Sequence, residues 1–555
     1  MPHTSSPATR AGRLPLAAVA ALAVLATASA GAVAASPAPL AADRGATVPF
    51  TEQEAEDART NGIVLAPDRD YGTLASEASG RRAVTLDAVD AFVEFTLTAP
   101  ANAMTFRYSI PDNPAGTGRD ASIDLRIGNS KPQPIPVTSR YGWFYGGYPF
   151  TNTPGGHPHH FYDETRVRFG STVPAGTTIT LQVSSTAGTP SVTIDLADFE
   201  VVAPAIGRPT GSLDAVADFG ADPSGRTDST AKLQAAVDAG RQQGRAVYVP
   251  AGNYTLYGHV IVDQVTVRGA GPWYTVLGGR DPGNRSRAAG LYGRYAADGG
   301  GSRDVTVRDL AVIGDIRERV DSDQVNAFGG SMSNSVIDNV WIQHTKAGAW
   351  MDGPMDNVVI RNSRILDQTA DGVNFHLGVT NSRVENTFVR NTGDDGLAMW
   401  AENVTNARNS FVRDTVVAPI LANNIAIYGG RDITVSDNVV RDTVTNGGGI
   451  HVANRYPGVQ GATAVSGTFT LARNTLQRAG NADYNWNFGV AALWFDGLNQ
   501  PLSATIDVTD TEIADSSYAA IGFVEGSTSG VSFRNVAIDR TGTYALQIQS
   551  PGSAS

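Results

Sequence analysis

The chain of 555 residues contains no cysteine. Disulfide bonds therefore cannot stabilise its fold. Hydrophobic residues make up 41% of the sequence, which is typical of an ordered globular protein, and the length is sufficient for two or three domains. A large core built by stacking of the chain on itself must supply the stability instead.

Charged residues are also few, at 17%, and the formal net charge is −12. This acidic balance disfavours polyanionic partners such as nucleic acid or pectate. A neutral ligand fits it better. The 60 glycines indicate many turns.

Long apolar runs are missing except near the start of the chain. Arg10 and Arg13 precede an alanine- and leucine-rich run from Leu14 to Leu25, and small residues follow at 28–30 and 33–35. The run is short and ends in a cleavage-like site, so residues 1–35 are predicted to be a secretory signal peptide, not a membrane anchor. The pattern predicts a secreted, extracellular protein.

The remaining chain divides into two parts. Residues 45–203 contain alternating strand-like runs such as AFVEFTLTAP and SVTIDLADFEVV, separated by turn clusters, which predicts an antiparallel β-sandwich. Residues 204–213 have the Pro/Gly composition of a linker, and residues 214–555 follow a different pattern.

That second part repeats every 23 to 36 residues, with short β-branched strands and polar turns. Each unit is too small to bury its apolar face alone, so successive units must stack. Leucine-rich repeats share the period but need leucines at fixed positions, so a parallel β-helix explains the pattern better. Its asparagines are expected to form a ladder along the axis: Asn339, Asn362, Asn386, Asn409, Asn438, Asn474 and Asn535. The last run ends in ALQIQSPGSAS without a polar cap, which leaves truncation or a missing coil open.

The stretch from Val216 to Leu256 resembles the opening of the pectate-lyase-like, right-handed β-helix superfamily. Within it, a strand in AVADFGA precedes an amphipathic helix expected from about Ser229 to Gln242, followed by AVYVPAGNY. The resemblance implies an all-β solenoid with a helix over its first coil. Lyases, hydrolases and phage tailspikes share this signature, so it does not fix the activity.

Three aspartates form the candidate catalytic site. Asp371 lies in TADGVNFH, and Asp394 and Asp395 lie in NTGDDGLAMW, 23 residues later. A separation of one coil places Asp371 beside the aspartate pair, since adjacent coils lie about 4.8 Å apart. Crowded carboxylates raise at least one pKa, which provides a proton donor and an acceptor. Ordinary turn chemistry and a Ca²⁺ site are the alternatives.

The segments ADGVNFH and NTGDDGLAMWAEN resemble the active-site segments of glycoside hydrolase family 87, the bacterial α-1,3-glucanases and mycodextranases. That family inverts anomeric configuration with three essential aspartates, which correspond here to Asp371, Asp394 and Asp395. A more distant resemblance to polygalacturonases implies that Asp394 is the general acid and that Asp371 and Asp395 activate water. The basic Arg-x-Lys cluster of polygalacturonases has no counterpart in this region, which favours a neutral glucan over pectin.

Other side chains near the trio are candidates for sugar binding. His376 and His451 could donate hydrogen bonds, with Arg455 close by, although a lone histidine is more often structural. Aromatic rings can stack on pyranose faces or belong to the core. The aromatic candidates are Trp350, Phe375, Trp400, Tyr428, Trp486 and Trp494, of which Trp400 and Trp494 are favoured.

The amino-terminal part resembles carbohydrate-binding modules of families 6 and 35. In those modules a Glu-x-Glu pair and a later aspartate hold a structural calcium, and the counterparts here are Glu54, Glu56 and Asp195. The loop YGWFYGGYPF, residues 141–150, is dense in aromatics. It is either a sugar-binding platform or a packed surface that faces the β-helix.

Taken together, these patterns predict a secreted hydrolase of α-1,3-glucan or nigeran, with no cofactor for catalysis. We expect a monomer that binds neutral α-glucan and neither nucleic acid nor a membrane. A polysaccharide lyase would need a basic residue close to the acids, and the sequence offers no obvious one. A non-catalytic glycan-binding adhesin would leave the aspartates as turn residues.

Overall fold

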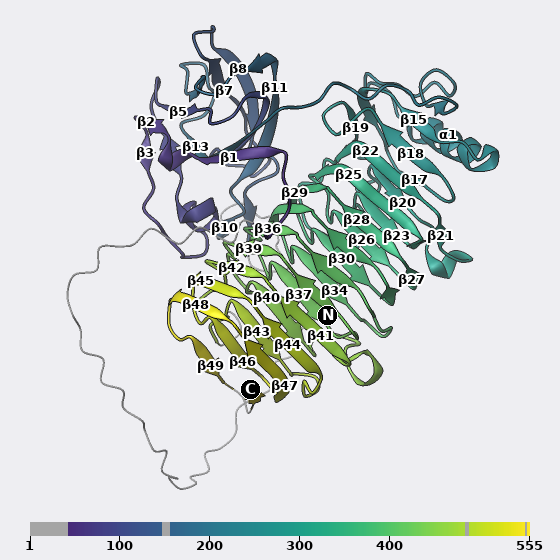
Figure 1. The fold of residues 1–555 in the computed structure, drawn as a ribbon. Coiled ribbons are helices and arrows are strands. Elements are labelled where there is room, and N and C mark those ends of the chain that lie inside the picture. The colour runs from purple at the N-terminus through teal and green to yellow at the C-terminus, as the bar shows by residue number, and fades with distance from the viewer. Residues whose placement is uncertain (1–42, 147–155, 483–487, 550–551, 555) are drawn as a thin grey trace. The chain divides into compact units, whose positions relative to one another are not determined.

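The computed structural model describes residues 43–146, 156–482, 488–549 and 552–554. The predicted signal peptide and Trp486 lie outside them, as does part of the aromatic loop. Asp43–Ser555 form one compact unit, in which an antiparallel β-sandwich is followed by a parallel β-helix (Figure 1). Among the described residues no helix has the length and apolarity needed to cross a bilayer.

The β-sandwich consists of two antiparallel sheets with apolar side chains between them, among them Phe95, Phe106 and Leu125. One sheet contains β1 (Phe50–Glu54), β3 (Ile63–Val64), β4 (Val84–Leu86), β6 (Ala101–Ser109), β11 (Asp163–Val173) and β13 (Val192–Glu200). The other contains β2 (Arg59–Thr60), β5 (Phe92–Thr96), β7 (Asp120–Ile127), β8 (Gln133–Thr138) and β12 (Thr178–Gln182). A short pair, β9 (Phe144–Tyr145) and β10 (Pro158–His159), extends from it.

The β-helix begins with the helix that the sequence predicts. Helix α1 (Thr230–Gln243) ends at Gly244, whose φ of 60° is the left-handed conformation that glycine adopts without strain. Leu233, Ala236 and Val237 are buried against the core of the first coils, so α1 covers that end of the apolar interior. Figure 1 shows it beside β15 and β17.

Successive coils pair in parallel, and most contribute three strands. Two of these join one long sheet: β14 (Leu213–Asp214), β15 (Val247–Val249), β16 (Gly252–Thr255), β18 (Thr266–Gly269), β19 (Thr275–Gly278), β22 (Thr306–Ile313), β25 (Ser335–Gln343), β28 (Val358–Arg361), β29 (Arg364–Gln368), β32 (Arg383–Glu385), β33 (Phe388–Thr392), β35 (Ser410–Val412), β36 (Thr415–Val417), β38 (Thr434–Ser436), β39 (Val439–Arg441), β41 (Thr468–Ala472), β42 (Thr475–Gln477), β44 (Thr505–Thr509), β45 (Glu512–Ser516), β47 (Thr528–Arg534), β48 (Ala537–Thr541) and β50 (Gly552–Ala554).

The third strand of each coil joins a second parallel sheet, which carries the candidate site and is called here the site sheet. It contains β17 (His259–Ile261), β20 (Gly290–Tyr292), β23 (Phe328–Gly330), β26 (Ala349–Asp352), β30 (Val373–His376), β34 (Leu397–Trp400), β37 (Ile425–Tyr428), β40 (Ile450–Ala453), β43 (Leu493–Asp496), β46 (Ile521–Val524) and β49 (Leu546–Ile548). Two short parallel pairs flank it: β21 (Ser302–Arg303) with β24 (Met332–Ser333), and β27 (Met355–Asp356) with β31 (Val379–Thr380).

The predicted asparagine ladder is divided between two kinds of position. Asn362 and Asn386 are themselves the left-handed residues of their turns, and the side-chain amide of Asn386 donates to that of Asn362. In other coils the asparagine follows the left-handed residue and is buried, and there the amide of Asn438 donates to Asn474. Each kind of amide links adjacent coils, so the ladder is real but is not one continuous column.

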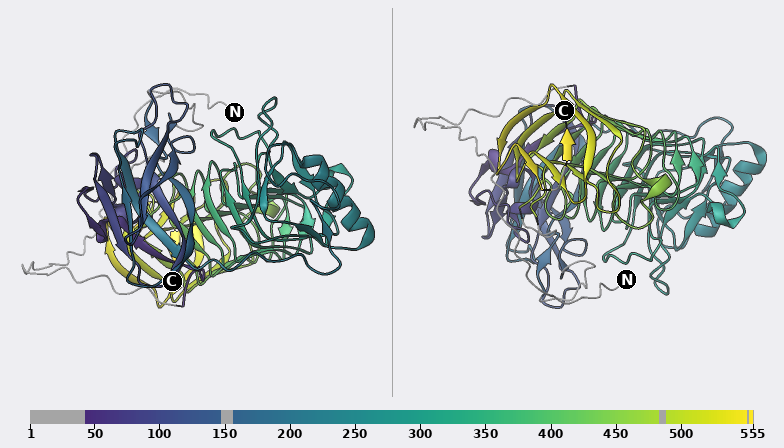
Figure 2. Two further views of the ribbon diagram at one scale, coloured as in Figure 1. Left: turned by 90° about the horizontal axis from the view of Figure 1, so that it is seen from above. Right: turned by 90° about the horizontal axis from the view of Figure 1, so that it is seen from below.

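The β-sandwich is bound to the β-helix through buried charges. Arg390 on β33 is 1% exposed and forms ion pairs with Glu164 and Asp198 at 2.7 Å and with Glu52 at 3.0 Å. Its neighbour Asn391 donates to the carbonyl oxygen of the sandwich residue Tyr162. Both views in Figure 2 show the sandwich strands alongside the coils. The contacts of Arg390 and Asn391 join the sandwich to β33, the strand that precedes Asp394 and Asp395.

A strap formed by residues 43–48 crosses the turns of several coils before β1 begins. Arg44 donates to the carbonyl oxygens of Asn474 and Asp510, and the Thr47 amide donates to the side chain of Asn386. The strap therefore ties turns together that lie far apart in the sequence.

Candidate active site

The register of the site sheet fixes the positions of two of the three aspartates. Val373 on β30 pairs with Leu397 on β34, so the coil here is 24 residues long and Asp371 is aligned with Asp395. The expected spacing of 23, which would align Asp371 with Asp394, is therefore one residue short. The amide of Gly372 donates to the carbonyl oxygen of Asp395, which holds the two aspartates on adjacent coils.

Glycine is needed after these aspartates because the coils approach closely. A Cβ at Gly372 would lie 2.3 Å from the carbonyl oxygen of Gly396, a distance that no side chain tolerates. The glycines of the DG segments are therefore explained by the close packing of the coils. This packing does not explain the aspartates that precede them.

Asp394 is the additional residue of its turn, and it completes a cluster. One carboxylate oxygen from each of Asp371, Asp394 and Asp395 lies within 4.8 Å of the others. Asp371 and Asp395 are buried, with 5% and 4% exposure, whereas 22% of the Asp394 side chain is exposed. The predicted trio is thus assembled at one point, with one carboxylate open to solvent.

A basic residue that sequence reasoning missed lies against this cluster. Arg319 donates to Asp394 at 2.5 Å and to the Gly393 carbonyl oxygen at 3.0 Å. It lies between β22 and β23, outside the repeating strands, so no periodicity indicates its place. The expectation that the acids have no basic partner is therefore wrong, because Arg319 forms an ion pair with Asp394.

Asp395 is held by three hydrogen bonds. The backbone amide and side-chain amide of Asn423 donate to one carboxylate oxygen at 2.8 and 2.9 Å, and the Tyr428 hydroxyl donates to the other at 2.8 Å. Burial and the nearby Asp394 charge raise the pKa of Asp395 to about 7, although these hydrogen bonds lower it. Asn423 occupies the same position as Asp395 in the next coil. The repeat could therefore have identified Asn423 from the sequence.

Asp371 has the environment of a carboxyl group that keeps its proton. Burial first, and then the charges of Asp394 and Asp395, raise the pKa of Asp371 well above the usual range, while Arg319 and Asn374 oppose this shift. Burial thus favours the protonated form of Asp371 and raises the pKa of Asp395 into the neutral range, which suits a site for acid–base chemistry.

These contacts favour catalysis over the calcium alternative for the trio. Arg319 already supplies a positive charge to Asp394, and both oxygens of Asp395 accept hydrogen bonds from uncharged donors. A hard cation bound here would have to compete with those partners.

His376 follows Asp371 on the site sheet and lies between two acids. Its Nδ1 is 2.7 Å from Asp352 and its Nε2 is 2.9 Å from Glu402. The rings of Trp350 and Trp400 lie 5.2 and 4.8 Å from the imidazole. This arrangement forms an aromatic and polar surface next to the aspartates, with Trp400 partly exposed.

The remaining ring candidates within the described residues are buried: Phe375, Tyr428, His451 and Trp494. Trp494 is 1% exposed, stacks on His451 at 3.3 Å, and donates through its indole N–H to Asn423. Because Asn423 in turn donates to Asp395, Trp494 supports an aspartate and has no ring face open to a sugar in this structure. Arg455 is engaged by Asp496 and Glu525.

The predicted calcium ligands fit an ion only in part. Glu54 and Glu56 each have a buried carboxylate oxygen without a hydrogen bond, which a hard cation would satisfy. Asp195, however, is bound by Arg107 and by the amide of Ser79. Among the described residues, this trio is not one of the groups whose ligand atoms lie within 4.8 Å of one another.

The described part of the aromatic loop faces the β-helix. Tyr141 stacks on His344 with ring centroids 3.6 Å apart, and its hydroxyl donates to Asp315 at 2.9 Å. Of the two interpretations of this loop, the packed surface agrees with these contacts. Asp315 also binds Arg317, so the loop contacts the segment that carries Arg319.

Comparison with family models assigns both parts of the chain. Residues 47–202 match the α-1,3-glucanase catalytic domain D1, and residues 226–549 match the α-1,3-glucanase catalytic domain D2. The chain belongs to glycoside hydrolase family 87. The residues of the sandwich thus match a catalytic-domain model, D1 of the α-1,3-glucanases.

Solved structures of family 87 agree with this assignment. The catalytic unit of the thermostable α-1,3-glucanase from Streptomyces thermodiastaticus is 40% identical, with a TM-score of 0.82 and coverage of 92% of this chain and 90% of that chain. A family 87 catalytic domain in complex with nigerose is 26% identical, with a TM-score of 0.78 and coverage of 92% and 99%.

A curated relative of a different activity matches over a shorter stretch. Alginate lyase 7 of Azotobacter vinelandii is 25% identical over 238 residues, which cover 40% of this chain. The matched region spans about a quarter (24%) of the length of that protein.

Proposed function

We propose that this family 87 protein is a secreted hydrolase of the α-1,3-glucosidic bonds of α-1,3-glucan or nigeran. The proposal rests on one observation: carboxylate oxygens of Asp371, Asp394 and Asp395 lie within 4.8 Å of one another beside the site sheet. In related family 87 catalytic domains, three aspartates with the same spacing have each been replaced by alanine, and these variants form complexes with nigerose or tetrasaccharides.

The trio supplies the two functions that hydrolysis requires. One carboxyl group gives its proton to the glycosidic oxygen as the bond from that oxygen to C1 breaks. A carboxylate accepts a proton from the water whose oxygen bonds to C1. Attack from the opposite face gives a product of β configuration, so the mechanism inverts.

We assign the acid to Asp394 because it is the most exposed of the three and can reach a bound sugar. Asp371 and Asp395 are buried on adjacent coils, where they can hold water between them. In the free enzyme Arg319 contacts the Asp394 carboxyl group, and burial raises the pKa of Asp371 beside it.

A substrate with a good leaving group tests this assignment. Departure of fluoride from an α-glucosyl fluoride needs little protonation, so an Asp394→Asn variant should still hydrolyse it if Asp394 is only the acid. Asp371→Asn and Asp395→Asn should not. Loss of fluoride release in Asp394→Asn alone would reassign the acid to the buried pair.

A retaining mechanism is the second candidate, and the short separation favours it. Inverting glycosidases usually hold their carboxyl groups about 6.5–9.5 Å apart and retaining enzymes about 5–5.5 Å apart. The nearest oxygens of this trio lie within 4.8 Å. Retention would produce the α-anomer by way of a covalent glycosyl-aspartate.

One experiment addresses both the substrate and the stereochemistry. The protein is incubated with insoluble α-1,3-glucan and with nigeran, and reducing ends and fresh product anomers are followed by NMR. β-Anomers that later mutarotate would support inversion, and α-anomers would support retention. Absence of reducing ends on either glucan, with binding kept, would overturn the hydrolase proposal in favour of a binding protein.

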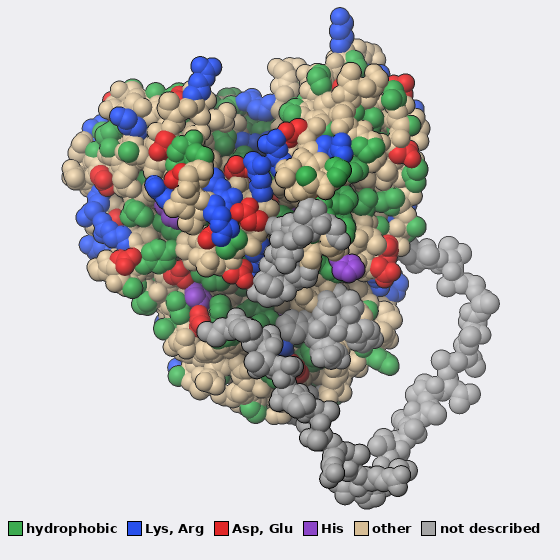
Figure 3. All heavy atoms as spheres, turned by 180° about the vertical axis from the view of Figure 1, so that it is seen from behind, with side chains coloured by type: hydrophobic (Ala, Val, Ile, Leu, Met, Phe, Trp, Pro, Cys, Tyr) green, Lys and Arg blue, Asp and Glu red, His purple; other side chains and the backbone are tan. Residues whose placement is uncertain are grey.

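The surface and the predicted export signal agree with a neutral extracellular partner. On the face shown in Figure 3, Lys and Arg side chains lie among Asp and Glu side chains instead of forming one basic patch. A lyase would need a uronic acid substrate, so alginate and pectate serve as negative controls.

Size-exclusion chromatography with light scattering tests whether the protein is the expected monomer. Amino-terminal sequencing of the exported protein tests the predicted signal peptide.

A further inference from the structure

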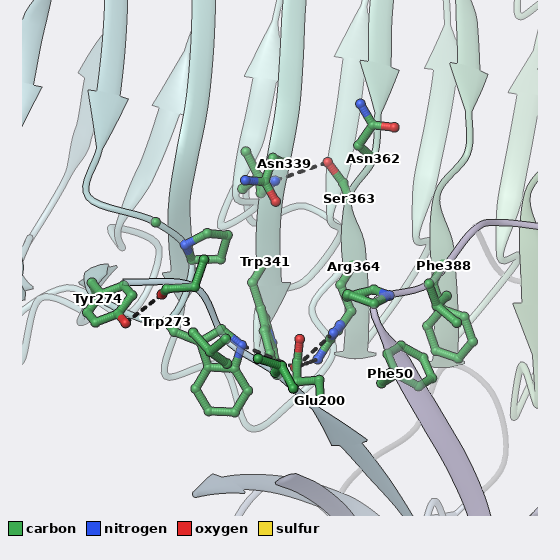
Figure 4. A pocket seen from close by; sticks show the side chains of 18 of the residues that line it. Phe50, Glu200, Trp273, Tyr274, Asn339, Trp341, Asn362, Ser363, Arg364 and Phe388 are labelled. Atoms are coloured by element: carbon green, nitrogen blue, oxygen red, sulfur yellow. Dashed lines mark hydrogen bonds and ion pairs between the residues drawn. The ribbon is translucent and has the colours of Figure 1, made fainter. Parts of the chain in front are cut away.

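A pocket lies away from the three aspartates, where the β-sandwich meets the turns of the coils. Its volume is about 310 Å³, the lower end of the range of small-ligand sites. It is bounded by the end of the strap, by the segment after β13 and by the turn between β18 and β19. Figure 4 shows the aromatic rings and the asparagine side chains that line it.

The walls of this pocket are aromatic. Trp341 and Phe388 are buried at its base, with 2% and 4% exposure, whereas Trp273 and Phe50 are partly exposed. The rings of Trp273 and Trp341 meet edge to face with centroids 5.3 Å apart, and those of Phe50 and Phe388 at 5.2 Å. The guanidinium groups of Arg166 and Arg364 lie over the buried Trp341 ring. The partly exposed rings of Trp273 and Phe50 supply the apolar surface on which the CH groups of a pyranose can pack.

The charges within the pocket cancel. Arg364 donates twice to the same oxygen of Glu200, each at 3.1 Å, and the indole N–H of Trp273 donates to that oxygen at 3.1 Å. Figure 4 shows this ion pair between the two groups of rings. A charged ligand would find no unpaired partner there, so the pocket favours a neutral one.

The rim carries side-chain amides of the asparagine ladder. Asn339 donates to Asp309, Asn362 to Asp338 and Asn386 to Asn362, which accounts for one hydrogen bond from each amide nitrogen. Each nitrogen has a second N–H, and Asn362 is exposed. Neutral amides above aromatic faces match a ligand rich in hydroxyl groups.

This pocket is separate from the catalytic cluster but shares its strands. Arg364 begins β29 and Phe388 begins β33, and each precedes an aspartate of the trio by seven residues. None of the three aspartates is among the residues that line the pocket. A sugar in the pocket therefore does not contact the aspartates.

We propose that this pocket is a second binding site for a neutral glucan, holding a short segment of an insoluble α-1,3-glucan while the aspartates cleave elsewhere. The inference rests on the proposed function for the identity of the glucan. Binding here raises the local concentration of substrate at the catalytic site without contributing to the chemical step.

The test uses Trp273→Ala, which removes a wall, and Val201→Trp, which adds bulk at a pocket residue that is 52% exposed. Tyr544→Ala is the matched control, because Tyr544 is an aromatic residue that is 59% exposed on the distant last coil. Binding to insoluble α-1,3-glucan is measured in an Asp394→Asn background. Hydrolysis of insoluble glucan and of soluble nigerooligosaccharide is measured in the active enzyme.

Both pocket variants should bind insoluble glucan about tenfold more weakly and hydrolyse it more slowly, with kcat on the soluble oligosaccharide unchanged. Tyr544→Ala should match the parent. Parental binding and rates in Val201→Trp, with the parental Tm, would overturn the inference even if Trp273→Ala fails to fold. Failure of the proposed function is seen separately, because the parent would release no reducing sugar from any α-1,3-glucan.

Discussion

The hydrogen bond from Tyr428 to Asp395 leads to a quantitative prediction for Tyr428→Phe. The hydroxyl donates at 2.8 Å to a carboxylate that is 4% exposed, so solvent does not screen the interaction. A hydrogen bond to a charged group contributes about 1.5–3 kcal/mol, and 1.36 kcal/mol corresponds to about one pKa unit. Because the two Asn423 donors remain, we take the lower end, a shift of about one unit.

The sign follows from which form the hydroxyl stabilises. Tyr428 favours the ionised form of Asp395, so its removal raises the pKa of Asp395 from about 7. If Asp395 must be ionised to accept a proton from water, kcat/KM falls as pH drops below this value. The acidic limb of the kcat/KM profile should therefore move up by about one pH unit in Tyr428→Phe.

The assay is release of reducing ends from a soluble nigerooligosaccharide between about pH 4 and 10. Tyr456→Phe is the control, because the Tyr456 ring packs against Tyr428 with centroids 4.7 Å apart. It should leave the acidic limb in place. A parental profile for Tyr428→Phe, with an unchanged Tm, would refute the role of Asp395 as a proton acceptor.

Three further outcomes follow from the structure. Asp394→Asn should reduce hydrolysis of α-1,3-glucan by about a thousandfold while glucan still binds, whereas loss of binding and turnover together would point to a structural role. Arg390→Met leaves buried carboxylates without their cation and should cost roughly 3–5 kcal/mol of stability by calorimetry, while Arg59→Met at an exposed ion pair should leave the Tm unchanged. Calcium should raise the Tm of the parent but not of a Glu54→Gln/Glu56→Gln variant, and an equal Tm in calcium and in chelator would remove the calcium proposal.

The sequence repeat was enough to predict most of the fold and the proximity of the three aspartates. Strands of similar length recur with a nearly constant period, so the stacking of coils follows from the sequence, and with it the proximity of Asp371 to the DD pair. The expected register is one residue short, because the spacing from Asp371 to Asp394 is 23 residues whereas strand pairing sets the coil at 24. Only backbone hydrogen bonds between coils fix such an offset.

Residues outside the repeat were less predictable. Arg319 lies in a loop between β22 and β23, and its contact with Asp394 depends on how that loop folds over the site sheet. Trp494 resembles a sugar platform in sequence, but the coil packs it on His451. Local sequence does not distinguish outward-facing aromatics that are open from those that neighbouring loops cover.

The buried charges around Arg390 bear on how this architecture can be inherited or engineered. Arg390 and Asn391 bind the sandwich, and Asp394 follows three residues later on the same turn. Excising the sandwich would remove the carboxylates that pair with Arg390, and this would leave an unpaired cation next to the catalytic turn. An accessory module can be exchanged between enzymes by recombination at a linker, but these two halves should be gained or lost together.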